Sequence, residues 1–148
     1  MTNSSNDREL ELEELVFDPR MQMTTSRIAI ADDDPACLEM LRIALRSRHT
    51  EICEAVNGAE LGRLLAEKGP FDLVVTDIHM PWMQGLQVLR SARAAEISTP
   101  VLVVTGLTQT GLQAKIDSLG NAKLLLKPFG IPELRAAISD LMAGQLPS

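Results

Sequence analysis

The sequence VVTDIHMP, residues 74–81, places one carboxylate, Asp77, directly after a run of apolar residues. The apolar run begins at Leu73 and is hydrophobic on consecutive rather than alternate residues. This pattern favours a strand that is covered on both faces, as in a parallel sheet. The Met-Pro pair then turns the chain away, so the stretch predicts a buried strand that ends at an acid.

Outward from this stretch, the chain alternates between short apolar runs and helix-length amphipathic segments. The five runs predicted as strands are RIAIA (27–31), EICEA (51–55), FDLVV (71–75), PVLVV (100–104) and KLLL (123–126). The segments predicted as helices are residues 34–47, 58–69, 84–95, 107–120 and 131–142. The alternation predicts an α/β protein, a (βα)5 fold with a doubly wound parallel sheet.

Two helices have informative ends. Asp34 is placed to cap the first helix, and Pro35 suits the first helical position. The helix over 107–120 is the weakest prediction, because Gly111 in a helix interior costs about 1 kcal/mol relative to alanine. We therefore expect this helix to be the mobile one.

Charge divides the chain unevenly. Residues 1–26 carry six acidic residues against two arginines, which predicts a separate acidic extension. Disorder is favoured there, and a helix that docks on a partner or dimerises is the alternative. The folded domain is expected over 27–143, followed by a short tail at 144–148. We expect either a single-domain protein or a fragment of a longer one.

Composition narrows the function classes. The chain has 148 residues and a formal net charge of −6, and it contains no cluster of basic and aromatic residues, which argues against direct nucleic-acid binding. No apolar run is long enough to span a membrane and the start does not resemble a signal peptide, so a cytoplasmic protein is expected. Cys37 and Cys53 lack metal-ligand spacing and are predicted to be buried free thiols.

Five polar residues lie where the predicted strands end. They are Asp32, Asp33, Asp77, Thr105 and Lys127. The carboxyl ends of parallel strands line one crevice, which is where ligands bind in open α/β sheets. Three converging carboxylates repel one another and favour a hard divalent cation, for which Mg²⁺ is the natural candidate. A lysine and a threonine beside them suit a phosphoryl group, and a carboxylate can itself be the nucleophile.

The motifs IADDDP (30–35), VVTDIHMP (74–81), VVTG (103–106) and LLLKPF (124–129) together resemble the receiver domain of two-component response regulators. The resemblance implies a flavodoxin-like sheet in the order 2-1-3-4-5. It also implies that Asp77 accepts a phosphoryl group from a phospho-histidine on a sensor histidine kinase or a histidine phosphotransfer protein.

The resemblance assigns roles to the other site residues. Mg²⁺ would be held by Asp32, Asp33, Asp77 and the backbone carbonyl of His79. Thr105 would be the switch hydroxyl, and Lys127 would pair with the phosphoryl group. The Lys127–Pro128 peptide matches a position that is typically cis. Such a protein acts only on its own aspartate and is not otherwise an enzyme.

Some positions depart from the family pattern. Leu124 replaces the aromatic residue that completes the usual switch, which leaves a phosphate-independent docking module, a pseudo-receiver, as the alternative function. His79 and Leu107 occupy variable positions that flank the phosphate. A downstream protein target or a homodimer is a possible further partner. A phosphatase of the haloacid dehalogenase type would need a second aspartate at His79, and no glycine-rich phosphate loop is present.

Overall fold

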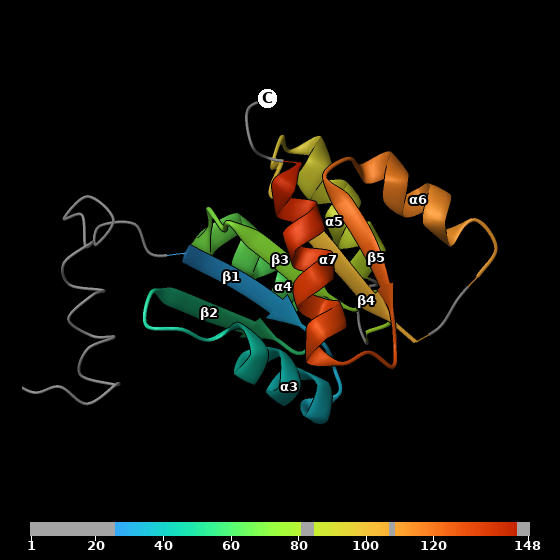
Figure 1. Ribbon diagram of the computed structural model, residues 1–148. Helices are drawn as coiled ribbons and strands as arrows, with labels where there is room; N and C mark the ends of the chain where they lie inside the picture. Colours follow the sequence, from blue (N-terminus) through green and yellow to red (C-terminus); the bar gives the residue numbers. More distant parts are fainter. Residues whose placement is uncertain (1–25, 81–84, 107–108, 145–148) are drawn as a thin grey trace, which may run out of the picture.

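The computed structural model describes residues 26–80, 85–106 and 109–144 (Figure 1). Its five strands are β1 (Ser26–Ala31), β2 (Thr50–Ala55), β3 (Leu73–Thr76), β4 (Val101–Thr105) and β5 (Ala122–Leu126). They form one parallel sheet in the order β2-β1-β3-β4-β5. The predicted fold class and strand order are therefore confirmed.

Helices cover both faces of this sheet (Figure 1). They are α3 (Pro35–Leu45), α4 (Gly58–Arg63), the π-helical turn η1 (Leu64–Lys68), α5 (Gly85–Ala94), α6 (Leu112–Leu119) and α7 (Ile131–Ala143). Helices α3 and α7 pack on one face, while α4, η1, α5 and α6 pack on the other. Each face has its own aliphatic core.

The strands supply alternate residues to the two cores. In β1, Ile28 and Ile30 pack under α3 and α7, whereas Ala29 and Ala31 face the opposite core. Strand β4 is buried along its whole length. This burial explains why the central strands are apolar on consecutive residues, since neither face of the sheet is left to solvent.

The ends of the helices confirm one prediction and correct another. The Asp34 side chain accepts a hydrogen bond from the Ala36 N–H at 3.0 Å, and Pro35 opens α3, as predicted. Helix α6, in contrast, begins only at Leu112, because Gly111 adopts a left-handed conformation with φ of 81° and precedes the helix. Gly111 thus lies directly before the first residue of α6 and is not the interior helix residue that was predicted. The mobility of α6 stays a prediction.

The two cysteines differ in burial. Both are free, but only Cys37 is buried, while Cys53 is partly exposed. The prediction of a buried Cys53 was wrong, because β2 is an edge strand and has a neighbour on one side only. The predictions for residues 1–25, Leu107 and the last four residues lie outside the described part of the chain.

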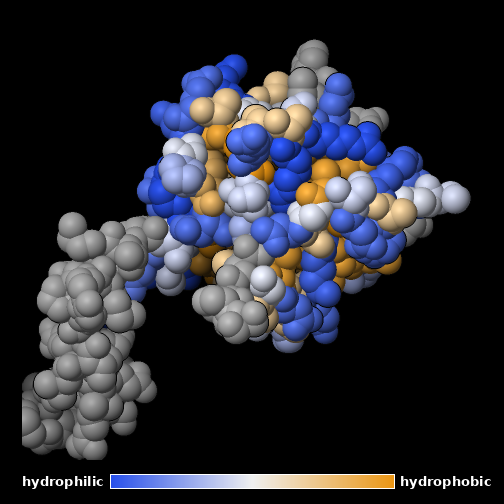
Figure 2. All heavy atoms as spheres, turned by 90° about the horizontal axis from the view of Figure 1, so that it is seen from above, coloured by the Kyte–Doolittle hydropathy of each residue, from blue (hydrophilic) through white to orange (hydrophobic). Residues whose placement is uncertain are grey.

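On the face seen in Figure 2, polar and apolar surfaces are interspersed. Figure 2 shows hydrophobic residues in several separate areas between hydrophilic ones. Among the described residues, the large hydrophobic side chains that are most exposed are Ile43, Val56 and Leu126, which come from α3, the segment after β2 and β5. Within the described ranges, no helix combines the length and the apolar character that crossing a bilayer requires.

A hollow of about 620 Å³ lies at the amino ends of β3 and β4. Its walls include Leu65 of η1, Phe71 before β3, and Pro100 before β4. None of the predicted site residues lines it, because they all follow the carboxyl ends of the strands, at the other end of the sheet.

Candidate functional site

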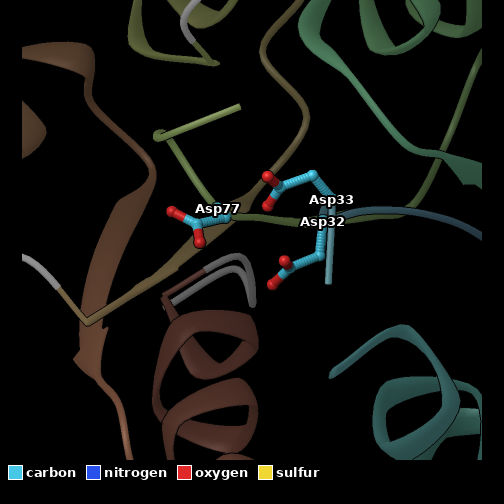
Figure 3. A group of neighbouring side chains, drawn as sticks. All are labelled: Asp32, Asp33 and Asp77. Atoms are coloured by element: carbon cyan, nitrogen blue, oxygen red, sulfur yellow. The ribbon is translucent and has the colours of Figure 1, made fainter. Parts of the chain in front are cut away.

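The three aspartates are brought together by the pairing of neighbouring strands. Asp32 and Asp33 follow β1, and Asp77 follows β3, which pairs directly with β1. The Asp77 N–H donates to the Ala31 carbonyl at 2.9 Å, so the sheet hydrogen bonding continues up to the site. One carboxylate oxygen from each aspartate lies within 4.8 Å of the others, and Figure 3 shows the three groups gathered in one place.

The carboxylates differ in their surroundings. Asp32 is fully buried and Asp77 is 6% exposed, whereas Asp33 is exposed. Main-chain N–H groups support the two buried ones: Asp34 donates to Asp32 Oδ1 at 2.9 Å, and His79 donates to Asp77 Oδ1 at 3.0 Å. Each carboxylate keeps acceptor capacity beyond these bonds, since its oxygens have about four lone-pair sites between them.

Lys127 is the cationic partner of this cluster. Its Nζ donates to Asp32 Oδ2 at 2.7 Å and to Asp77 Oδ2 at 3.0 Å. Burial by itself would lower the pKa of Lys127, but the hydrogen bonds to the two carboxylates raise that pKa above its ordinary value. The ammonium group is therefore charged at neutral pH and offsets part of the negative charge.

Thr105 and Lys127 are placed side by side by the pairing of β4 with β5. Thr105 is fully buried at the end of β4, and its carbonyl accepts from the Lys127 N–H at 2.8 Å. Gly106 follows, and a Cβ there would meet Lys127 Cβ at 3.7 Å, an ordinary contact distance. The structure thus brings the side chains of Asp32, Asp33, Asp77 and Lys127 together at the carboxyl ends of the strands, with Thr105 beside Lys127 through its main chain.

Two residues that were not predicted hold the main chain at Asp77. The buried Thr76 Oγ1 donates to the Asp77 carbonyl at 2.7 Å. The Gly85 N–H donates to the Ile78 carbonyl at 3.1 Å, and a Cβ at position 85 would lie 2.6 Å from the Asp77 carbonyl oxygen. The only sequence signal for the second residue was a glycine shortly after the Met-Pro turn, and this close approach was not visible in the pattern.

Cys37 was also missed as a neighbour of the site. Burial raises the pKa of the Cys37 thiol to about 12, and the nearby Asp32 carboxylate adds to the shift. The thiol is therefore neutral at physiological pH and presents no additional anion to the acidic cluster.

Two further positions are of interest because they depart from the family pattern. His79 is half-buried, and its Nε2 is a buried atom that has no hydrogen-bond partner among the described residues. Leu124 of β5 is half-buried and packs against the core under α6. Position 124, where the resemblance implies an aromatic residue, thus carries an aliphatic side chain.

The donor set suits a magnesium ion. All three carboxylates offer oxygen ligands. The cluster found among the described residues contains no cysteine and no histidine side chain. Hard oxygen donors with a net negative charge are what Mg²⁺ prefers. Asp32, Asp33 and Asp77 therefore fit the expected metal in number, type and proximity.

Comparisons with known proteins agree with this geometry. A family model for the response regulator receiver domain matches residues 28–139. The transcriptional regulatory protein PrrA of Mycobacterium tuberculosis is 34% identical over 125 residues, which is 81% of this chain and 51% of that protein. The cell cycle transcriptional regulator CtrA of Caulobacter vibrioides is 29% identical over 117 residues, covering 76% of this chain and 48% of that protein. The chain thus spans about half the length of these relatives.

Solved structures show the same likeness. The chemotaxis response regulator CheY4 of Vibrio cholerae superposes with a TM-score of 0.69 at 25% identity, over 80% of this chain and 99% of that one. The signal receiver domain of the response regulator NarL from Mycobacterium tuberculosis gives a TM-score of 0.70 at 28% identity, over 81% of this chain and 98% of that one.

Proposed function

The chain belongs to the response regulator receiver domain family, and on this premise we propose that Asp77 accepts a phosphoryl group from a phospho-histidine donor. The single observation that carries the proposal is the convergence of Asp77 with Asp32, Asp33 and Lys127 at the carboxyl ends of the strands. A histidine kinase or a histidine phosphotransfer protein is the expected donor.

The transfer exchanges one bond for another. An Asp77 carboxylate oxygen attacks the phosphorus atom, and the bond between phosphorus and the donor imidazole nitrogen breaks, with its electron pair staying on that nitrogen. Asp77 attacks as a carboxylate, so the transfer relies on positioning and charge stabilisation rather than on a protein general base. The His79 N–H at Oδ1 and the Lys127 ammonium at Oδ2 orient the nucleophile before the donor arrives.

Asp32, Asp33, Asp77 and the backbone carbonyl of His79 would hold Mg²⁺. When bound, the ion would supply positive charge that offsets the repulsion between the carboxylates and the incoming phosphoryl oxygens. Lys127 turns from the carboxylates toward the phosphoryl group, since its side chain is 24% exposed and has a flexible stem. The Thr105 hydroxyl donates a hydrogen bond to a phosphoryl oxygen.

The phosphorylated domain then signals by a change in population between two conformations. Inward movement of Thr105 pulls on the segment between β4 and α6, which starts at Gly106. Leu124 replaces the aromatic residue, so the signal passes through aliphatic packing under α6 rather than through the rotation of an aromatic ring.

The folded receiver unit is proposed to extend over 27–143, with an acidic extension before it. PrrA and CtrA are transcriptional regulators about twice as long as the matched region. A downstream protein target or a homodimer is therefore the proposed reader of the switch. The domain turns over no substrate other than its own phosphorylated aspartate.

The decisive experiment is intact mass after incubation with acetyl phosphate, with and without Mg²⁺. We expect a single phosphoryl adduct that requires Mg²⁺ and is absent in Asp77→Asn. The matched control is Asp34→Asn, which changes a neighbouring carboxylate that caps α3 and should keep the adduct. No adduct under any condition would favour the phosphate-independent docking module instead.

A further inference from the structure

Arg93, near the end of α5, binds main-chain carbonyls from two other segments. Its Nη1 donates to the Ile97 carbonyl at 2.8 Å, in the turn that leads to β4. Its Nε donates to the Leu119 carbonyl at 2.9 Å, and its Nη2 donates to the carbonyls of Gly120 at 2.8 Å and Asn121 at 3.3 Å. The guanidinium thus joins the end of α5 to the end of α6.

These bonds are made without a carboxylate partner among the described residues. Burial lowers the pKa of the Arg93 guanidinium from its ordinary value, and no acidic group among the described residues offsets this effect. Arginine nevertheless stays protonated in proteins, so a full positive charge lies at the carboxyl end of α6. The last carbonyls of a helix lack intrahelical partners and carry partial negative charge, which makes them good acceptors for this cation.

Helix α6 has no side-chain cap at its amino end and no charged residue of its own that would stabilise either end. Its last turn contains no basic residue of its own. At its other end, Gly111 gives no side-chain cap and the first turn contains no acidic residue. The inward face of the helix packs through Leu112, Ile116 and Leu119. The carboxyl end of α6 is therefore fixed by polar bonds, whereas the amino end rests on packing and main-chain contacts.

The amino end of α6 is also the end nearest in sequence to Thr105. From these contacts we propose that Arg93 is the pivot of α6, so that a change at Thr105 swings the amino end of the helix while its carboxyl end stays in place. This inference rests on the proposed function, because phosphorylation of Asp77 is what would change the position of Thr105. The pivot itself is a property of the unmodified protein and can be tested there.

The first test is hydrogen exchange of the full chain, read by mass spectrometry, for the native protein, Arg93→Gln and Arg90→Gln. Arg90 lies one turn earlier on α5 and is exposed, and it makes no hydrogen bond or ion pair with the described residues, so it is a matched control. Arg93→Gln should speed exchange over 117–121 by roughly tenfold or more, since several charged hydrogen bonds are lost. Exchange in β4 and α7 should not change, and Arg90→Gln should behave like the native chain.

The second test adds acetyl phosphate and Mg²⁺, with the adduct counted by intact mass in the same samples. In the native chain, phosphorylation should alter exchange over 109–114 and leave 117–121 unchanged. In Arg93→Gln, the same adduct should alter exchange along the whole of α6. A native adduct that changes both ends of α6 equally would overturn the pivot while supporting phosphoacceptance.

Absence of an adduct would count against the proposed function, and the first test would still decide whether Arg93 fixes the helix end. Arg93→Lys guards against a variant that fails to fold, because lysine keeps the charge but lacks the fork that reaches several carbonyls. We expect intermediate exchange over 117–121 for this variant. Native-like exchange in both Arg93 variants would show that Arg93 does not hold α6.

Discussion

The main chain around Asp77 leaves no room for a side chain at position 85. A Cβ there would lie 2.6 Å from the Asp77 carbonyl oxygen and 3.0 Å from Ile78 Cα, and backbone atoms cannot move aside as a flexible side chain can. At the scale of single residues, the Asp77 main chain can thus take its position only because residue 85 is a glycine and has no side chain.

Gly85→Ala should therefore lower both stability and the rate of phosphorylation. The expected loss is about 2 kcal/mol, as for other forced contacts in packed regions. Gly62→Ala is the matched control, because its Cβ would meet only Val88 Cγ1 at 3.8 Å, and alanine favours a helix by up to about 1 kcal/mol. Urea unfolding and the rate of adduct formation measure the two effects; equal behaviour of the two variants would contradict the close approach.

Cys37 should be far less reactive than Cys53. Burial raises the pKa of Cys37 to about 12, so at pH 8 its reactive thiolate is scarce, while Cys53 is partly exposed. Iodoacetamide in the folded protein should modify one thiol, identified as Cys53 by peptide mapping, and both thiols in urea. Rapid double modification without denaturant would be incompatible with a buried, neutral Cys37.

The raised pKa also has a consequence for stability. A thiol that ionises near its ordinary value of 9.0 when unfolded, but at about 12 when folded, favours the folded state below pH 9. This contribution is lost as the pH rises from 9 to 12. Cys37→Ala should therefore show a smaller loss of stability over that range than the native chain.

At the scale of elements, adjacent aspartates serve different purposes. Asp34 caps α3, whereas Asp33 lies in the carboxylate cluster and is exposed. The Asp34 main chain, not its side chain, supports Asp32. Substituting Asp33 and substituting Asp34 should therefore have different effects, the first on the carboxylate cluster and the second on the helix cap.

Asp34→Ala should cost about 1 kcal/mol of stability through loss of the cap, and it should keep the Mg²⁺ requirement of adduct formation unchanged. Asp33→Ala should keep stability near the native value and raise the Mg²⁺ concentration needed by roughly tenfold or more. Thermal unfolding in EDTA and a Mg²⁺ titration of the phosphorylation rate separate the two effects. Loss of stability in Asp33→Ala with an unchanged Mg²⁺ requirement would refute this division.

At the scale of the whole molecule, the site joins the ends of β1, β3, β4 and β5. Two carboxylates in this cluster are almost fully buried, and Lys127 is the cation that compensates them in the metal-free protein. Removing one member of a buried ion pair leaves an uncompensated charge, which is costly. Global stability and metal binding should therefore depend on each other.

Lys127→Ala should lose about 2–3 kcal/mol of stability in EDTA, and Mg²⁺ should restore much of the loss by supplying the missing positive charge. The control is Lys123→Ala, since the one ion pair of Lys123 with the described residues is a long one of 3.9 Å to Asp140, and both side chains are exposed. Urea unfolding with EDTA or Mg²⁺ measures both variants. If Lys127→Ala lost the same free energy of unfolding in EDTA and in Mg²⁺, a metal bound by the carboxylates that pair with Lys127 would be excluded.

The sequence by itself determined the five strands, the helices between them, the cap at Asp34 and the five polar residues at strand ends. Hydrophobic periodicity and turn chemistry are local properties, so they can be read from the order of residues. Only the tertiary structure decided that Gly85 touches the Asp77 backbone, that Cys53 lies on an open edge, and that Arg93 caps a helix 26 residues further along the chain. These features depend on distances between segments that pack together only when the sheet has formed, and periodicity carries no information about such distances.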